Sequence, residues 1–305
     1  MPQSGRGIPR LACTLLVSLL AGSGAEANGP PIHTETAFVT GLQGAAFRSF
    51  VRTVDKSAPG RDLRVISVPL IFPYELIPNR LVVGGAIPYL DKELETKVGG
   101  SRQRLGNSGF GDVTLFSKVQ VLQKDRPGGT TRLTLLGRVK LPTGEHHARD
   151  PDGDFLARPL QVGTGSFDIS GGAVLTNLKQ RWGVNADLLY TATTEDESFR
   201  FGNALRYDLA LAFRVAPKVY EIYPSPQLNL FLEFNGETRE RDRLRGDSLA
   251  DSGGTTIFVS PGIQYMFGRT FLIESSVQLP VVENLNGDQL ETDTTFTLGI
   301  RWLGL

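Results

Sequence analysis

Large hydrophobic residues alternate with polar or small residues along many stretches of this chain. Between positions 205 and 215 every odd position is hydrophobic, whereas the even positions hold Arg206, Asp208, Ala210, Ala212 and Arg214. The same period of two recurs at 228–234, 271–279 and 296–302. Successive side chains of a β-strand point to opposite faces, so this period predicts strands with one apolar and one polar face.

The alternation predicts twelve strands joined by short and long connections in turn. The connections at 124–129, 178–181 and 268–269 are short, whereas those at 90–110, 142–165, 192–203 and 237–254 are long. This arrangement is typical of antiparallel strands that run up and down around a barrel. The predicted strands are 45–55, 61–72, 80–89, 111–123, 130–141, 166–177, 182–191, 204–215, 227–236, 255–267, 270–280 and 293–302.

The second predicted strand contains two prolines, Pro69 and Pro73. Each proline removes a backbone N–H donor from the strand ladder. A bulge or an early end is therefore expected in this strand.

Strand length separates a membrane barrel from a soluble sandwich, which also alternates. A strand of a membrane barrel needs about 9 to 11 residues to cross the bilayer, whereas strands of soluble proteins are most often about 5 to 6 residues long. The predicted strands fit the longer class. The sequence therefore favours an all-β fold, an up-and-down antiparallel transmembrane β-barrel of about 12 strands, over a secreted soluble β-protein. Aromatic residues near the strand ends agree with an interfacial girdle: Tyr89, Tyr190, Phe213, Phe234, Phe267, Phe271 and Trp302.

The amino terminus resembles a secretory signal. Arg6 and Arg10 precede an apolar run at 11–21, and Ala25-Glu26-Ala27 has the form of a cleavage site. The run is too short to cross a membrane as a helix, which takes about 20 residues. Residues 1–27 are therefore predicted to be a signal peptide that is removed on export.

Two further regions follow the predicted signal. Residues 28–44 are expected to be a periplasmic N-terminal segment or plug, and residues 45–305 form the predicted barrel. With an even number of strands, both termini face the periplasm and the long connections face the cell surface. The predicted location is the bacterial outer membrane.

Composition removes several classes of function. The 305 residues carry 32 Lys and Arg against 32 Asp and Glu, so the chain lacks the basic excess that attracts nucleic acid. The single cysteine, Cys13, lies in the predicted signal. A disulfide scaffold, a thiol enzyme and a cysteine zinc site are therefore excluded for the exported chain.

Gly246-Asp247-Ser248-Leu249 matches the nucleophile block of GDSL esterases. A serine hydrolase of that kind needs a histidine later in the chain, but no histidine follows His147. The block is interpreted as part of a solvated surface loop.

A second polar stretch combines His146 and His147 with Asp150, Asp152 and Asp154. The carboxylates are calcium-type ligands, but the spacing does not fit an EF-hand loop. A polar turn accounts for the residues equally well, and neither a metal nor a cofactor is predicted.

Four arginines alternate through another predicted loop, at 239, 241, 243 and 245. Guanidinium groups bind phosphate in a bidentate manner, so lipopolysaccharide is a candidate partner. An exposed loop of mixed charge is the favoured interpretation.

The polar face of the strands provides the candidate site, because in a barrel it lines the lumen. The charges on this face either pair across strands and close the interior or line a wet channel. Inward apolar residues, Phe50, Phe116, Leu136, Leu189 and Phe231, either form patches for an apolar solute or pack against a plug made of residues 28–44. The predicted lumen-lining residues are Arg132, Arg138, Lys140, Arg206, Asp208, Arg214, Glu233, Glu274 and Arg301, with Asp112, Asp168 and Asp187 on the same face.

Several short motifs occur in a familiar order. They are 109–113 (GFGDV), 140–144 (KLPTG), 163–168 (GTGSFD), 260–265 (SPGIQY) and 297–302 (TLGIRW). Together they resemble the outer-membrane barrel family named for the meta-cleavage pathway of phenol degradation. The resemblance covers residues 40–302 and implies a channel or transporter for aromatic or other apolar small molecules.

The sequence therefore predicts an outer-membrane channel that passes small, apolar or aromatic molecules passively through its lumen. A non-conducting structural or adhesive barrel is the alternative, and an outer-membrane lipase is a further one. The expected partners are outer-membrane lipid and lipopolysaccharide, a small-molecule solute, and the barrel-assembly machinery during biogenesis.

Overall fold

The computed structural model describes residues 29–39, 44–98, 101–219, 225–268 and 270–303. The predicted signal peptide, residues 1–27, lies outside the described residues. Among the residues described, no helix is long and apolar enough to cross a bilayer.

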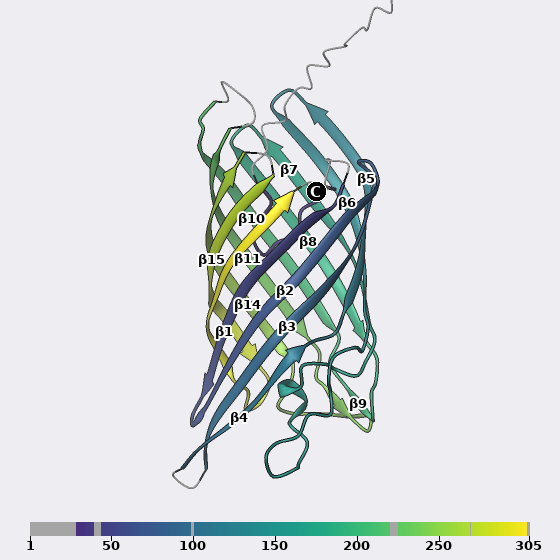
Figure 1. Ribbon diagram of the computed structural model, residues 1–305, viewed down its shortest axis with the longest axis vertical. Coiled ribbons are helices and arrows are strands. Elements are labelled where there is room, and N and C mark those ends of the chain that lie inside the picture. The colour runs from purple at the N-terminus through teal and green to yellow at the C-terminus, as the bar shows by residue number, and fades with distance from the viewer. Residues whose placement is uncertain (1–28, 40–43, 99–100, 220–224, 269, 304–305) are drawn as a thin grey trace, which may run out of the picture.

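The protein is a closed antiparallel barrel of twelve strands (Figure 1). Each strand pairs with its neighbour in the chain, and the last strand pairs with the first through Ala46 opposite Leu303. The predicted all-β, up-and-down fold is thus confirmed. The barrel strands are β1 Ala46–Ala58, β2 Arg61–Ile77, β3 Leu81–Val98, β5 Thr114–Arg126, β6 Gly129–Lys140, β7 Asp168–Lys179, β8 Trp182–Thr193, β10 Ala204–Ala216, β11 Gln227–Arg239, β14 Gly254–Phe267, β15 Phe271–Leu285 and β16 Glu291–Leu303.

The period of two puts apolar side chains outside and polar ones inside. In β10, Leu209 and Leu211 are exposed, whereas Asp208 and Ala210, which alternate with them, are buried. Exposed aromatic residues near strand ends include Tyr190 and Trp302. A closed sheet with an apolar outer surface and a polar interior is what a bilayer requires of a barrel, because every backbone group must be paired within the protein.

The connection predicted at 90–110 is largely a hairpin, not a loop. β3 continues to Val98 and pairs with β4, Ser101–Phe110. This stretch lacks hydrophobic alternation, so the period of two gave no signal for it. Cross-strand ion pairs accompany the hairpin, such as Arg104 with Glu93 at 3.2 Å.

Of the two alternatives expected for the second strand, the early end is wrong, because β2 runs through both prolines to Ile77. A register shift does occur in its pairing with β3, between Glu75 and Ile77. Its pairing with β1 skips the stretch between Ser67 and Leu70, which contains Pro69. The missing donor thus interrupts one ladder without ending the strand, since pairing with β3 continues through Pro69.

The two ends of the barrel differ. Leu303 and Ala46 share one end, which we call the termini end. The connections at 141–167, 194–203 and 240–253 lie at the opposite end, which we call the loop end (Figure 1). Small elements in these loops are the 3-10 turn η1, Arg158–Leu160, and the short strands β9, Phe199–Arg200, β12, Arg243–Leu244, and β13, Asp247–Ser248.

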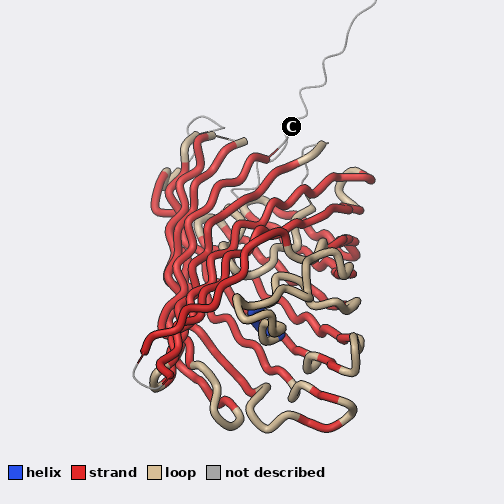
Figure 2. Tube along the Cα trace, turned by 60° about the horizontal axis from the view of Figure 1, so that its bottom comes forward, coloured by secondary structure: helices blue, strands red, loops and turns tan. Residues whose placement is uncertain are grey.

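The connection 141–167 folds across the mouth of the barrel at the loop end. Figure 2 shows η1 and the chain around it in front of the opening between the strands. Leu160 and Val162 are buried there. This connection therefore narrows access to the lumen from the loop end.

Candidate functional site

Charged side chains on the inner face near the termini end form one cluster. Glu274 of β15 pairs with Arg301 of β16 at 2.9 Å and with Arg48 of β1 at 2.9 Å. Gln264 of β14 donates to the same carboxylate at 3.2 Å. The buried charge of Glu274 is therefore compensated by two cations and a neutral donor.

Residues 29–39, which we call the N-terminal segment, lie inside the barrel against this cluster. Its backbone carbonyls accept hydrogen bonds from side chains of the wall. The contacts are Gln264 Nε2 to Pro30 O at 2.9 Å, Arg301 Nη2 to Pro31 O, and Arg48 Nη2 to Ile32 O at 2.5 Å.

Glu233 of β11 is fully buried and binds the next part of the segment. Its two carboxylate oxygens accept the backbone N–H groups of Ile32 at 2.8 Å, His33 at 3.1 Å and Thr34 at 2.7 Å. The Thr34 hydroxyl donates to Glu233 at 2.7 Å as well. One acidic side chain thus satisfies three consecutive backbone donors that are not part of any sheet.

Glu35 is the centre of the segment's contacts with the opposite wall. Its backbone N–H donates to Asp187 of β8 at 2.7 Å. Its carboxylate binds Lys118 of β5 and Arg138 of β6. Because β5 and β6 lie across the ring from β15 and β16, the segment crosses the lumen from wall to wall.

Apolar contacts accompany the polar ones. Gly262 of β14 makes room for the segment, since a Cβ atom there would lie 2.6 Å from Ile32 Cδ1. Three of the predicted inward apolar residues pack with the segment, while Phe50 and Phe116 are half-buried. The two buried clusters are Ala37 with Leu136, Val174 and Leu189, and Ile32 with Ala212 and Phe231.

The remaining predicted lumen residues are spread along the interior. Arg214 is fully buried in β10 near the termini end. Arg132 lies over the Phe38 ring at 4.6 Å from its centroid. The other ion pairs are Arg206 with Asp208 at 3.1 Å and with Asp187 at 3.5 Å, and Lys140 with Asp168 at 2.9 Å and with Asp112 at 3.1 Å.

A cavity of about 530 Å³ lies toward the loop end, and we call it the loop-end cavity. Its wall includes apolar side chains, among them Leu90, Val162 and Leu189, and the charged side chains Arg138 and Lys140. The volume is in the range of small-molecule sites, about 300 to 1,000 Å³. Among the predicted lumen residues, Glu233 and Arg301 contact the N-terminal segment, Lys140 and Arg206 border this cavity, and Arg138 does both.

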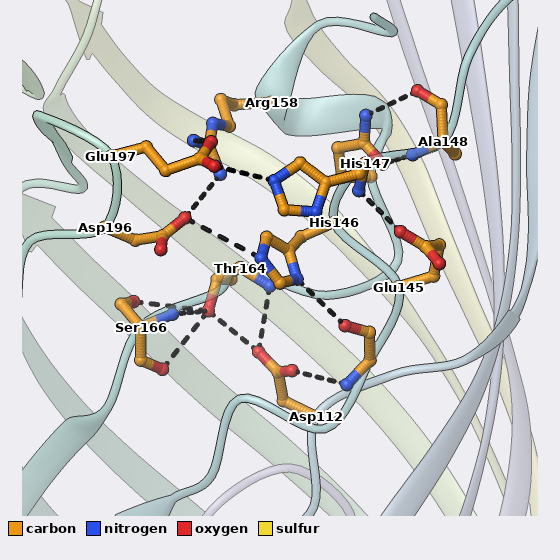
Figure 3. Close-up of polar contacts among 12 residues, drawn as sticks. Asp112, Glu145, His146, His147, Ala148, Arg158, Thr164, Ser166, Asp196 and Glu197 are labelled. Carbon is orange, nitrogen blue, oxygen red and sulfur yellow. Dashed lines mark hydrogen bonds and ion pairs between the residues drawn. The ribbon is translucent and has the colours of Figure 1, made fainter.

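Three of the family-like motifs meet beside the cavity, which Asp112, Lys140 and Thr164 border. Figure 3 shows Asp112 beside Thr164 and Ser166. Asp112 accepts hydrogen bonds from the backbone N–H of Gly144 at 2.9 Å and of Thr164 at 3.0 Å. Gly163 approaches Gly144 closely, and a Cβ atom at Gly163 would lie 2.2 Å from Gly144 O. The motifs 109–113, 140–144 and 163–168 therefore fix the position of the connection 141–167.

Burial by itself raises the pKa of Asp112. The hydrogen bonds from Gly144 and Thr164 and the charge of Lys140 outweigh burial and hold this pKa below its usual range. Asp112 is therefore a charged acceptor at neutral pH, which strengthens its hydrogen bonds to the connection.

The two histidines in this connection contact a neighbouring loop. His147 Nε2 lies 2.8 Å from Glu197 Oε1, and Arg158 binds Asp196 at 2.8 Å and Glu197 at 2.9 Å (Figure 3). The hydrogen bond to His147 is the largest cause of a lowered pKa for Glu197. The histidines thus join two loops at the barrel mouth.

The other candidate chemistries lie apart from the lumen. Within the described ranges, no group of three or more His, Cys, Asp or Glu residues is placed to hold a metal ion. Asp150 accepts hydrogen bonds from the backbone of Asp152 and Asp154 in its own turn. Ser248 is exposed in β13, in agreement with a surface position.

Sequence reasoning missed three residues that organise the interior: Glu35, Arg48 and Lys118. Arg48 lies two positions from Phe50 and Lys118 two positions from Phe116, both predicted to point inward. The period of two would therefore have placed Arg48 and Lys118 on the inner face as well. Glu35 lies in a segment without any periodicity. Its partners are 83 and 103 positions away in the chain, so local pattern carries no information about the contact.

The fold matches that of an outer membrane channel from Pseudomonas putida F1, with a TM-score of 0.67 and 12% sequence identity over 90% of this chain and 99% of that one. The β domain of the Bordetella autotransporter BrkA is less similar, with a TM-score of 0.45 and 12% identity over 85% and 98%. Comparison with curated proteins gave no match. The family model described as MetA-pathway of phenol degradation matches residues 63–282, and the chain belongs to this family.

Proposed function

We propose that this protein is a passive channel of the bacterial outer membrane for small molecules, closed at rest by its N-terminal segment. Solute crosses through the lumen when the segment moves aside. The apolar side chains around the loop-end cavity suit small apolar or aromatic solutes, which is also what membership of the family suggests. Catalysis has no place in this proposal.

The observation that carries the proposal is how the N-terminal segment is attached. Barrel strands such as β1 and β16, or β10 and β11, hold one another by backbone ladders of about ten or more paired positions. The segment is held by apolar packing and by side chains such as Glu233 and Arg301, which hydrogen-bond to its backbone. It can therefore leave the lumen without breaking any strand pairing.

The proposed surroundings follow from the outer surface. Its apolar side chains contact outer-membrane lipid, and the loop end faces lipopolysaccharide and the cell exterior. Insertion by the barrel-assembly machinery is part of the same proposal, as is removal of residues 1–27 before insertion.

The experiment compares the exported chain with a variant that lacks residues 29–39, both in planar lipid bilayers and in liposomes. The full chain is expected to conduct rarely and to admit a small aromatic solute slowly. The shortened chain is expected to conduct at least about tenfold more, because the lumen loses the segment that crosses it. A shortened, correctly folded barrel with neither conductance nor uptake contradicts the proposal.

A structural barrel without transport is the second candidate, and the ion pairs that fill the interior favour it. It predicts no conductance from either chain. It also predicts that trimming residues 142–165 abolishes cell adhesion or envelope integrity, whereas the channel proposal predicts faster solute uptake from that change.

A further inference from the structure

Two basic side chains of the barrel wall form a site for a carboxylate. Lys118 of β5 and Arg138 of β6 lie on neighbouring strands, with Lys118 opposite Leu136 in the register. Lys118 Nζ binds Oε2 of Glu35, and Arg138 Nη2 binds Oε1 of the same group. The two cations thus hold the two oxygens of one carboxylate, which is the geometry that gives strong charge-assisted binding.

The carboxylate in this site belongs to the removable part of the molecule. Glu35 is the only acidic group among the described side chains that lies within ion-pair distance of Lys118 or Arg138. When the N-terminal segment moves aside, the wall is left with two partly buried cations and no acidic group within ion-pair distance, while Asp187 of β8 acts on Arg138 from farther away. Such a site has a high affinity for another anion, since unpaired charges are costly in a partly buried position.

The site can be reached from the loop end. Arg138 borders the loop-end cavity, as does Leu189, which also packs against Ala37 of the segment. A solute in the cavity therefore has a cation at one point and apolar surface beside it. That combination suits a small molecule with one carboxylate and an apolar body.

We propose that Lys118 and Arg138 bind the carboxylate of an aromatic or other apolar organic acid, and that Glu35 occupies their site as an internal substitute. Binding of the acid and release of Glu35 are then competing events at the same two cations, so the solute itself favours opening. This inference rests on the proposed channel function and names the class of solute.

The test measures equilibrium binding of benzoate to the purified, folded full-length exported chain in detergent. Replacing the internal carboxylate by Glu35→Ala is expected to tighten benzoate binding about tenfold, because the competing group is gone. Glu237→Ala is the matched control: it removes an acid that also borders the cavity, but Glu237 pairs with Arg239, not with Lys118 or Arg138. If both changes tightened benzoate binding equally, the effect would come from the overall electrostatic potential of the cavity and not from release of Lys118 and Arg138. That result would overturn the proposal.

Two further arms identify the site and the ligand class. In the Glu35→Ala background, Arg138→Gln is expected to cancel the gain in affinity, and benzamide, which is neutral, is expected to bind at least about tenfold more weakly than benzoate. Benzoate and benzamide binding with equal affinity, or a double variant that keeps the gain, contradicts the assignment. Circular dichroism of each variant verifies the barrel, so a loss of binding through misfolding is recognised.

Liposome uptake separates this inference from the channel proposal. Uptake of a neutral aromatic solute without benzoate binding leaves the channel function standing and removes the carboxylate site. If benzoate binding changes in the variants as expected but the barrel passes no solute, the carboxylate site is supported and the channel function is contradicted.

Discussion

The two halves of the lumen contain similar side chains that do different things. From the middle of the lumen to the termini end, Glu233 and Glu274 are completely buried, and their oxygens are used by the N-terminal segment or by the cations that hold it. Toward the loop end, Lys140 and Asp168 border an open cavity. An inward charge therefore does not by itself indicate a channel lining, because a peptide inside the barrel can use the same group.

The difference follows from what each half has available as a partner. At the termini end the partner is backbone, since the segment has no sheet in which to place its N–H and C=O groups. At the loop end the partners are side chains of the barrel and its connections, such as Asp168 of β7 and Asp112 of the connection 111–113 for Lys140. Breaking the first set should open the lumen, and breaking the second should alter only its mouth.

The largest effect is expected from Glu233→Leu. Four donors of the segment lose their acceptor, and each buried unpaired donor costs about 1–3 kcal/mol. The segment should leave the lumen, and the conductance of single barrels in planar bilayers should rise more than about tenfold.

Glu237→Leu is the control for that change, because Glu237 lies on the same strand and borders the loop-end cavity without an acceptor role for the segment. It should leave conductance within about twofold of the unchanged protein. Equal conductance of the Glu233→Leu variant and the unchanged protein would mean that the segment is not held through Glu233.

An intermediate effect is expected from Arg301→Met. The segment loses the donor to Pro31 O, but Glu274 keeps Arg48 as its partner, so only part of the attachment is removed. Since the sole cysteine of the chain is Cys13, in the predicted signal, a cysteine introduced as Thr36→Cys is a clean probe of the segment. Its labelling by a bulky maleimide should be about three- to tenfold faster with Arg301→Met.

Arg301→Lys gives the matching control. Lysine keeps the charge but loses the planar guanidinium that reaches both Pro31 O and Glu274. The labelling rate of the cysteine in the Arg301→Lys variant should therefore lie between the rates with Arg301 and with Arg301→Met. Labelling at the unchanged rate in both variants would contradict a role of Arg301 in attachment.

The strands were predictable because a bilayer enforces a strict rule at each position. In β10 every second side chain meets lipid, so residues 204–215 were recognised within one position of the observed Ala204–Ala216. The β3–β4 hairpin lies outside this rule, because it projects beyond the part of the sheet with alternating apolar residues. Its charged sequence was interpreted as a loop for that reason.

The interior was predictable only in part. Period alone placed Glu233 and Glu274 on the inner face, but it could not tell whether their partners would be water, other strands or the N-terminal segment. The packing of Leu136, Leu189 and Phe231 was one of two open interpretations; all three contact the N-terminal segment through Ala37 or Ile32, and Leu189 also borders the cavity. Contacts between residues about two hundred positions apart, such as Glu233 with Thr34, leave no local trace in one sequence.

The smallest effect is expected from Asp112→Asn at the loop end. The amide keeps an acceptor oxygen but loses the charge that strengthens the hydrogen bonds from Gly144 and Thr164, a change of about 1 kcal/mol. Limited proteolysis within residues 145–158 should become about twofold to fivefold faster at pH 7. Asp150→Asn, which affects only its own turn, should leave the cleavage rate unchanged.

The pH dependence of proteolysis separates the contribution of the charge of Asp112 from that of its hydrogen-bond acceptor geometry. A carboxyl group whose folded pKa lies below its unfolded pKa contributes stability that is present above the unfolded value, here 3.8, and is lost as the pH falls through the folded value. Protection of the connection 141–167 in the unchanged protein should therefore stay constant from pH 7 down to about 5 and decrease below pH 3.8. The Asp112→Asn variant should lack the part of this decrease that comes from Asp112. An identical acid profile in both proteins would show that the connection is held at the barrel mouth by contacts other than this carboxylate.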